Sequence, residues 1–221
     1  MINIALGFDK GYCRHAGATI QSIICNTKTP IRFYLMIDKT VNKLNRYFYK
    51  NLIEKKGHQV EFVDMSSNFD GLYTGNWSKA MYYPIVLPNI IKNNDKVLFL
   101  DSDTIVTKDL SEFYNTDLED FYAAAVHDCA MRSVIKMKRK MKMSLSKEKI
   151  TMEEYFSNIR HWGDEDINKY FNSGMLLLNL DLIRKDNCVE KMLNILKTEN
   201  LACPDQDCFN ICFHDKVKIM P

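Results

Sequence analysis

Apolar runs of strand length alternate with amphipathic stretches over the first hundred residues of the chain. Four runs are apolar almost throughout, as buried strands are, and they lie at residues 2–8, 31–37, 60–63 and 96–100. Two stretches between them, 16–26 and 41–56, carry apolar residues at helical spacing, and Gly57 ends the second. Strands that alternate with helices predict a largely parallel sheet flanked by helices.

The second half of the chain is less regular. A helix is expected over 79–91 in spite of Pro84 and Pro88. The remaining patterns predict strands at 121–126, 175–180 and 217–220 and helices at 181–196 and 206–213. No internal repeat is present, so the sequence predicts one α/β domain over 1–221, with a mostly parallel Rossmann-like central sheet and a smaller second region.

A basic segment, 132–149, interrupts this second region. It carries lysines and arginines together with Val134, Met137, Met141 and Leu145 at helical spacing, which predicts an amphipathic helix. A solvated surface helix is the favoured interpretation. A lid, an acceptor-binding face or a contact with a membrane surface is the alternative.

The composition is that of an ordinary packed domain. The chain has 221 residues, 46% of them hydrophobic, which is enough to bury a core without a metal or a disulfide. A formal net charge of +2 gives no whole-chain reason to expect a nucleic-acid partner. No apolar run approaches the ~20 residues of a membrane span, and the N-terminus lacks the features of a signal peptide, so we expect neither a transmembrane segment nor secretion.

Seven cysteines, an odd number without a CxxC pair, suggest reduced thiols and a cytoplasmic location. Cys208, Cys212 and His214 have a spacing that allows a zinc site. Small cysteines buried on a helix are far commoner, and we favour that interpretation.

The strongest chemical signal is a pair of acids directly after the apolar run 96–100. In an extended chain residues i and i+2 point to the same side, so Asp101 and Asp103 face one space. Two carboxylates suit a hard cation such as Mn²⁺ or Mg²⁺, whose coordination shell is commonly completed by substrate phosphates. Ligands of open α/β sheets bind at the carboxyl ends of strands, where these acids lie.

A phosphatase of the haloacid-dehalogenase kind is an alternative source of two such acids. Its signature requires Thr or Val two residues beyond the second acid, where this chain has Ile105. It also normally begins the fold, whereas here three strands come first. We therefore rank the phosphatase below a metal-phosphate site.

Polar residues at the ends of other elements accompany the acids. The first strand leads into Asp9, which can accept from a base N–H, and Tyr12, on whose ring a base can stack. There is no GxGxxG fingerprint or P-loop. Small polar residues at 172–174 precede an apolar strand, and 204–207 (Pro-Asp-Gln-Asp) opens a helix, where acids favour the positive end.

These four motifs, in this order and over essentially the whole chain, resemble family 8 glycosyltransferases, the family of glycogenin and of bacterial lipopolysaccharide galactosyltransferases. The resemblance implies a GT-A fold, a UDP-sugar donor, Mn²⁺ (Mg²⁺ as the alternative), a glycan or protein acceptor, and transfer with retention of anomeric configuration. It also implies that 1–103 is the nucleotide-binding half and 104–221 the sugar and acceptor half. Oligomeric state is left open, a homodimer included.

Carried over by position, the resemblance assigns the metal to Asp101 and Asp103 and places Gln206, Asp205 and Asp128 at the reacting sugar. Because a neutral amide is a poor nucleophile, we assign Gln206 a positioning role. The donor-binding residues implied are Asp9, Gly11, Tyr12, Lys79, Ser102, Asn172, Ser173 and Gly174. Lys79 is included because the chain has Pro84 where many members have an arginine.

The family also supplies a histidine metal ligand and a phosphate-binding lysine from a segment downstream of the position that matches Pro221. On this basis the C-terminal ligand segment is expected to be missing. The alternative function is then a nucleotide-sugar-binding protein with little turnover.

Overall fold

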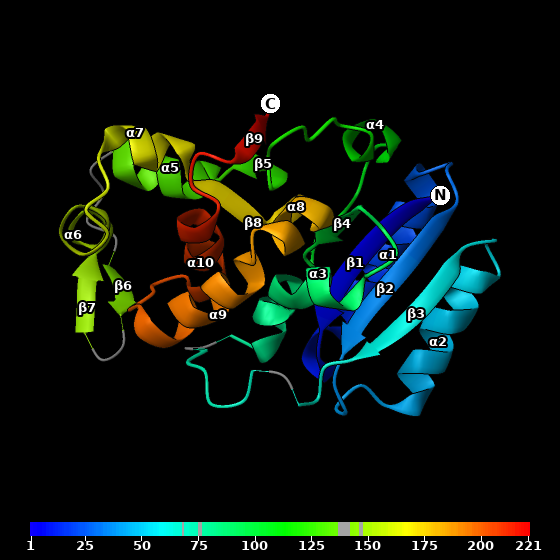
Figure 1. The fold of residues 1–221 in the computed structure, drawn as a ribbon. Helices are drawn as coiled ribbons and strands as arrows, with labels where there is room; N and C mark the ends of the chain where they lie inside the picture. The colour runs from blue at the N-terminus through cyan, green and yellow to red at the C-terminus, as the bar shows by residue number, and fades with distance from the viewer. Residues whose placement is uncertain (68, 75–76, 137–141, 146–147) are drawn as a thin grey trace.

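The computed structural model describes residues 1–67, 69–74, 77–136, 142–145 and 148–221. Its centre is a seven-stranded sheet in the order β3-β2-β1-β4-β8-β5-β9 (Figure 1). Only β8 runs against its neighbours, β4 and β5, and the other pairs are parallel. The strands are β1 (Ile2–Phe8), β2 (Ile31–Ile37), β3 (Gln59–Asp64), β4 (Lys96–Leu100), β5 (Ala123–His127), β8 (Phe171–Asn179) and β9 (Val217–Met220).

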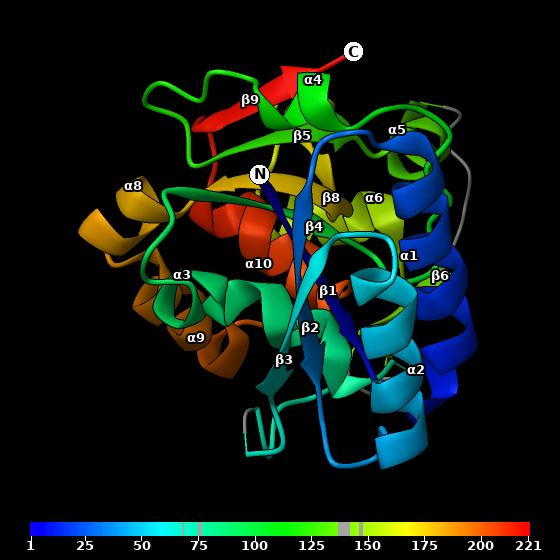
Figure 2. The ribbon, with the colours of Figure 1, turned by 90° about the vertical axis from the view of Figure 1, so that its right-hand side faces the viewer.

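Two layers of helices cover the two faces of this sheet (Figure 2). On one face Ile4, Leu6 and Phe8 of β1 pack in the same core cluster as buried residues of α1 (Cys13–Asn26) and α2 (Lys43–Glu54). On the other face Ala5 shares a cluster with the second layer. That layer comprises η2 (Lys79–Val86), α3 (Leu87–Ile90), α8 (Leu180–Lys185), α9 (Cys188–Thr198) and α10 (Pro204–Cys212). The alternation along β1 follows from the two-residue period of a strand.

Shorter elements complete the chain: η1 (Lys10–Tyr12), α4 (Ser111–Tyr114), α5 (Cys129–Lys136), β6 (Lys142–Leu145), β7 (Glu148–Thr151), α6 (Met152–Glu154), η3 (Tyr155–Ile159) and α7 (Asp164–Lys169). No helix in the described parts of the chain is both long enough and apolar enough to cross a membrane. The α/β class and the mostly parallel sheet are confirmed, and four strands, β1, β2, β4 and β9, have the bounds predicted from the sequence.

Local signals bound the second helix, which the sequence predicts over 41–56 and which forms α2 (Lys43–Glu54). Asn42 caps α2 by accepting from the Asn45 N–H at 2.9 Å. Gly57 follows the helix with φ +80°, a conformation that glycine adopts without a steric penalty.

Two predicted helices are built differently. Over 79–91 the chain forms a 3-10 helix, η2, followed by the short α3. The reason is that Pro84 and Pro88 lack the N–H that a continuous α-helix needs. Over 181–196 the chain forms α8 and α9, separated at Asn187, whose φ of 53° is left-handed.

The amphipathic helix predicted over 132–149 is confirmed at 132–136 and is wrong at 142–145 and 148–149. The helix α5 ends at Lys136, and β6 pairs with β7 as an antiparallel two-stranded sheet. Residues 137–141 and 146–147 lie outside the described residues. Within β6 the apolar Met143 and Leu145 alternate with polar residues, a two-residue period that the longer helical pattern obscured.

Candidate functional site

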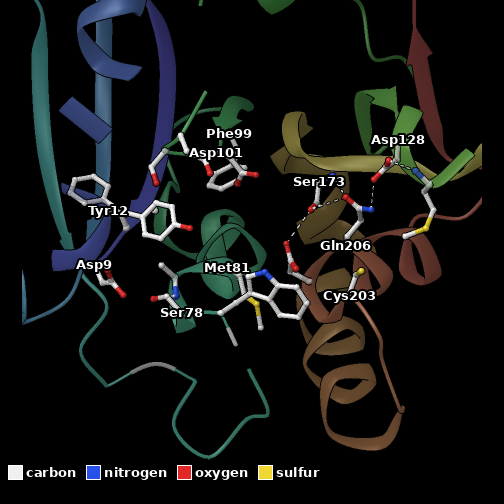
Figure 3. Close-up of a pocket in the computed structure, with 18 residues that line it drawn as sticks. Asp9, Tyr12, Ser78, Met81, Phe99, Asp101, Asp128, Ser173, Cys203 and Gln206 are labelled. Carbon is white, nitrogen blue, oxygen red and sulfur yellow. Dashed lines mark hydrogen bonds between the residues drawn. The ribbon is translucent and has the colours of Figure 1, made fainter. Parts of the chain in front are cut away.

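A cavity of about 430 Å³ opens at the carboxyl ends of β1 and β4 (Figure 3). Asp9 and Tyr12 lie on one wall, Ser173, Gln206 and Asp128 on the other, and Asp101 between them. The predicted site residues that line it are Asp9, Tyr12, Asp101, Ser102, Asp103, Asp128, Ser173, Asp205 and Gln206. The tertiary structure therefore gathers residues separated by almost two hundred positions into one cavity.

The loop that carries the two acids is held from both sides. The Asp101 N–H donates to the Gly174 carbonyl of β8 at 2.8 Å, and the Thr104 hydroxyl donates to the Asp101 carbonyl at 2.9 Å. From α1, the fully buried Thr19 hydroxyl lies 2.9 Å from the Ser102 carbonyl and 2.8 Å from that of Thr104. Because main-chain contacts fix the loop, the two carboxylates remain available to a ligand.

The electrostatics of this loop favour a bound cation. The side chain of Asp101 is open to the cavity, yet the surrounding protein desolvates it and Asp103 repels its charge, which raises its pKa to about 6. A divalent cation between two oxygen-ligand carboxylates offsets both costs. Among the residues that the structure describes, no three His, Cys, Asp or Glu side chains form a metal-binding group, so the pair would be completed from a substrate or water. The residues present fit a divalent cation held jointly with a phosphate.

Gly174 leaves room for Asp101. A Cβ at this position would lie inside van der Waals contact with Oδ2 of Asp101, and 3.0 Å from both Cγ of Asp101 and Oδ1 of Asn172. The Asn172 side chain in turn accepts from the Gly174 N–H at 2.8 Å. Neither residue lines the cavity, and both shape the wall behind Asp101.

The amide of Gln206 is held at both ends. Its Oε1 accepts from the Ser173 N–H at 3.0 Å, and its Nε2 donates to Oδ2 of Asp128 at 2.8 Å. The other oxygen of Asp128 accepts from the Met131 N–H at 2.8 Å, at the start of α5. The orientation of the Gln206 amide is therefore set by β8 on one side and by the entry to α5 on the other.

Asp205 lies beside this amide. Burial, and secondly the charge of Asp101, raise the pKa of Asp205 to about 7. The Ser173 hydroxyl donates to Oδ2 of Asp205 at 3.0 Å and has a smaller, opposite effect. Asp101 and Asp205 thus share one region of concentrated negative charge.

Sequence reasoning missed the role of Asp207. This residue is 1% exposed, and its carboxylate accepts from the Tyr155 and Tyr170 hydroxyls at 2.7 Å each and from the N–H groups of Ala202 and Cys203 at 2.9 and 2.8 Å. Burial raises its pKa, and these donors oppose the shift. The carboxylate fixes the backbone that enters α10, where Asp205 and Gln206 lie.

The other wall of the cavity is formed by Asp9 and Tyr12, which follow β1. Asp9 accepts from the Gly11 N–H at 2.7 Å and so caps η1, while the Tyr12 ring is 42% exposed. Gly11 itself lies outside the lining. Lys79 is also outside the lining, and its ammonium group forms an ion pair with Asp70.

Several lining residues had no sequence signal of their own: Gly7, Phe8, Trp77, Ser78, Ala80, Met81, Phe99, Met131 and Cys203. Trp77 is 54% exposed, which only the structure reveals.

The proposed zinc alternative does not form. The thiols of Cys208 and Cys212 point to the carbonyls of Met192 and Cys188, at 3.4 and 3.7 Å. His214 instead lies 2.9 Å from Asp166. All seven cysteines fall within the described residues, and each is unpaired.

Comparison with known proteins gives the family. The sequence profile of glycosyl transferase family 8 matches residues 3–221. A putative glycosyltransferase of Haemophilus influenzae is 30% identical over 99% of this chain and 61% of its own length. General stress protein A of Bacillus subtilis is 25% identical over 94% and 68%, and a lipopolysaccharide 1,2-glucosyltransferase of Escherichia coli is 26% identical over 100% and 60%. The chain thus spans about 60 to 68% of the length of these relatives.

Solved structures confirm the fold. The WbbM bifunctional glycosyltransferase in its apo form matches with a TM-score of 0.83 at 23% identity, over 100% of this chain and 38% of that one. The galactosyltransferase LgtC in complex with donor and acceptor sugar analogs matches with a TM-score of 0.77 at 24% identity, over 99% and 73%. The GT-A prediction is confirmed, and the haloacid-dehalogenase alternative is unsupported. With the family profile covering nearly every residue, the chain belongs to glycosyl transferase family 8.

Proposed function

We propose that this chain transfers a hexose or pentose from a UDP-sugar to a glycan or protein acceptor, with retention of anomeric configuration. The observation that carries the proposal is the meeting of Asp101 and Asp103 with Asp205 and Gln206 around one cavity of about 430 Å³. The names of two curated relatives, lipopolysaccharide 1,2-glucosyltransferase and lipopolysaccharide 1,3-galactosyltransferase, are consistent with a sugar donor of this class.

Asp101 and Asp103 would hold Mn²⁺, or Mg²⁺, together with the donor diphosphate. Such an ion neutralises charge on the departing nucleoside diphosphate, a Lewis-acid contribution of roughly several kcal/mol. The protein contributes placement: the Gly174 carbonyl and the Thr19 hydroxyl hold the loop, so little reorganisation is needed when the donor binds.

The nucleotide would lie against the wall formed by Asp9 and Tyr12. Tyr12 offers an exposed ring for stacking with uracil, and Asp9 has a second carboxylate oxygen beyond the one that caps η1. Residues 1–103 would thus bind the nucleotide, with Gly11 and Ser102 shaping its contacts, and 104–221 would bind the sugar and the acceptor.

The sugar would face the opposite wall, formed by Ser173, Asp205 and Gln206 and supported from behind by Asn172 and Gly174. Because Oε1 of Gln206 already accepts from Ser173 and Nε2 already donates to Asp128, the amide is suited to positioning and poorly suited to covalent attack. We assign Asp128 to this sugar wall as well.

Calorimetry tests the proposal directly. UDP should bind in the presence of Mn²⁺, and Asp103→Asn should weaken that binding by about tenfold or more, because one charged ligand is lost. Equal affinities for the two proteins would refute the metal assignment. Incubation with a panel of UDP-sugars then separates transfer or donor hydrolysis from binding without turnover, which would favour a nucleotide-sugar-binding protein.

The seven unpaired cysteines support a reducing compartment, and we propose a cytoplasmic location for this activity. Fractionation of the native host, with detection of the chain by an antibody, tests this location.

A further inference from the structure

The helix α2 is apolar on two opposite sides. Its inner side packs Tyr49 and Ile53 into the core, with exposures of 1% and 0%. Its outer side carries Leu44, Tyr47 and Phe48, which are 74%, 67% and 55% exposed. A surface helix normally presents polar residues there, and packing within this domain leaves more than half of each of these three residues exposed.

These three side chains form one patch. Positions 44, 47 and 48 are spaced i, i+3 and i+4, so they share one side of the helix. Phe48 also leans toward α1, since a Cβ on Gly17 would lie 3.6 Å from its ring. Figure 2 shows α1 and α2 beside each other on the outside of the sheet. Three of the eight large hydrophobic side chains exposed in the described structure are therefore on this helix.

Positive charge surrounds the patch. Lys43 and Lys50, four residues before and three residues after Tyr47, are exposed beside the patch. Arg14 is exposed on the neighbouring α1. The segment 43–56 holds five basic residues and one acid, a formal charge of +4. The whole chain carries only +2, so all other residues together carry −2. Two of these basic residues, Lys55 and Lys56, follow the helix, so α2 itself carries +2, as much as the whole chain.

We propose that the outward side of α2, defined by Lys43, Leu44, Tyr47, Phe48 and Lys50, binds an anionic lipid surface. Apolar and aromatic side chains flanked by lysines are the composition with which a helix lies in the plane of a bilayer interface. The lysines can reach anionic headgroups while their stems cover apolar surface.

A second copy of the chain fits this surface less well. Three such side chains expose on the order of 400 Å², whereas each side of a standard protein interface buries roughly 800 Å². A row of lysines would also face a like-charged row across a two-fold axis. A lipid surface needs no complementary shape, and attraction between the lysines and anionic headgroups adds to the burial of a small apolar area.

The position of α2 suits an enzyme that works at such a surface. The helix follows β2, and its first turn lies at the carboxyl edge of the sheet, where the cavity opens. Two hydrogen bonds join α2 and the residues before it to the segment that carries Asp9 and Tyr12. The Lys10 N–H donates to the Thr40 hydroxyl at 3.1 Å, and the Tyr49 hydroxyl donates to the Cys13 carbonyl at 2.6 Å.

Vesicle flotation tests the proposal with the full chain. It should float with phosphatidylcholine vesicles that contain phosphatidylglycerol, and not with phosphatidylcholine alone, and salt should weaken binding. Leu44→Gln with Tyr47→Gln, and separately Lys43→Gln with Lys50→Gln, should each reduce binding about tenfold or more. Tyr73→Gln is the matched control, because this tyrosine is 52% exposed on the segment after β3 and should leave binding unchanged.

Two results would overturn the proposal. One is binding that is absent, or equal for anionic and neutral vesicles, or unaffected by both α2 variants. The other is a dimer, seen by light scattering, that the Leu44→Gln with Tyr47→Gln variant dissociates while vesicles bind neither protein. Melting temperatures within a few degrees of the parent verify that the exposed substitutions leave the fold intact.

Discussion

Replacement of Gly174 by alanine should disable the acidic loop without unfolding the domain. The added Cβ would meet Oδ2 of Asp101 inside van der Waals contact and its Cγ at 3.0 Å. Since non-bonded atoms rest near ~3.5–4.0 Å, the carboxylate must withdraw by about 1 Å. The φ of Gly174 is not in the left-handed region, so alanine meets no backbone penalty and the effect is purely steric.

The expected losses differ for function and for stability. A displacement of about 1 Å at a positioning group costs about a hundredfold in rate, or ~2.7 kcal/mol. Rotation of Asp101 to another conformation costs only ~0.5–1.5 kcal/mol, a change of a few degrees in melting temperature. Mn²⁺-dependent UDP affinity by calorimetry and donor hydrolysis are the functional measurements, and thermal unfolding is the stability measurement.

Gly163→Ala is the matched control, because the nearest atom to its added Cβ is Oδ2 of Asp166 at 3.9 Å and the site is remote from the cavity. It should behave as the parent in every assay. If Gly174→Ala keeps UDP affinity and turnover within threefold of the parent, the carboxylate of Asp101 does not need this position, and the reasoning is refuted.

Three further predictions concern Asp128 and Asp205, on the cavity wall that carries Gln206, and Asp207, which fixes the backbone behind that wall. Asp128→Asn keeps a capping residue for α5 but loses the charged acceptor of Gln206, so turnover should fall about tenfold or more while melting changes little; equal turnover in a donor assay would contradict this. Asp207→Asn removes the charge from a carboxylate with four donors and should cost roughly 2–4 kcal/mol in urea unfolding. The pKa of Asp205 is raised from 3.8 to about 7, so the native state keeps a proton that the unfolded chain releases; stability is greatest below pH 4 for this group and is lost as pH rises through 7. Asp205→Asn should therefore flatten the dependence of melting temperature on pH between 4 and 8, and an unchanged slope would show that the pKa is not raised.

Local sequence patterns predicted most of the strands and helices of the fold. The bounds of β1, β2, β4 and β9 followed from apolar runs, and Gly57 predicted the end of α2 to within two residues. The pattern failed at 142–151, where two short strands pair with one another. Strand pairing is a contact between separate segments, and a periodicity of few residues does not distinguish it from one long helix.

The sequence by itself also predicted candidate site residues and the family. Asp101 and Asp103 were recognisable because two acids after a buried strand face one space, and the order of four motifs identified the family. It did not determine what those residues touch. Gln206 forms hydrogen bonds with Ser173 and Asp128, which are 33 and 78 positions away in the chain. Asp207 accepts from the hydroxyls of Tyr155 and Tyr170, which are 52 and 37 positions away.

Only the tertiary structure decided these contacts, because hydrogen bonds between distant segments depend on how strands and helices are packed. It likewise decided that Lys79 pairs with Asp70, and that the second apolar side of α2 faces outward with Lys43 and Lys50 beside it. The sequence determined which groups are available and the order of the elements along the chain. The packing of those elements determined which groups meet.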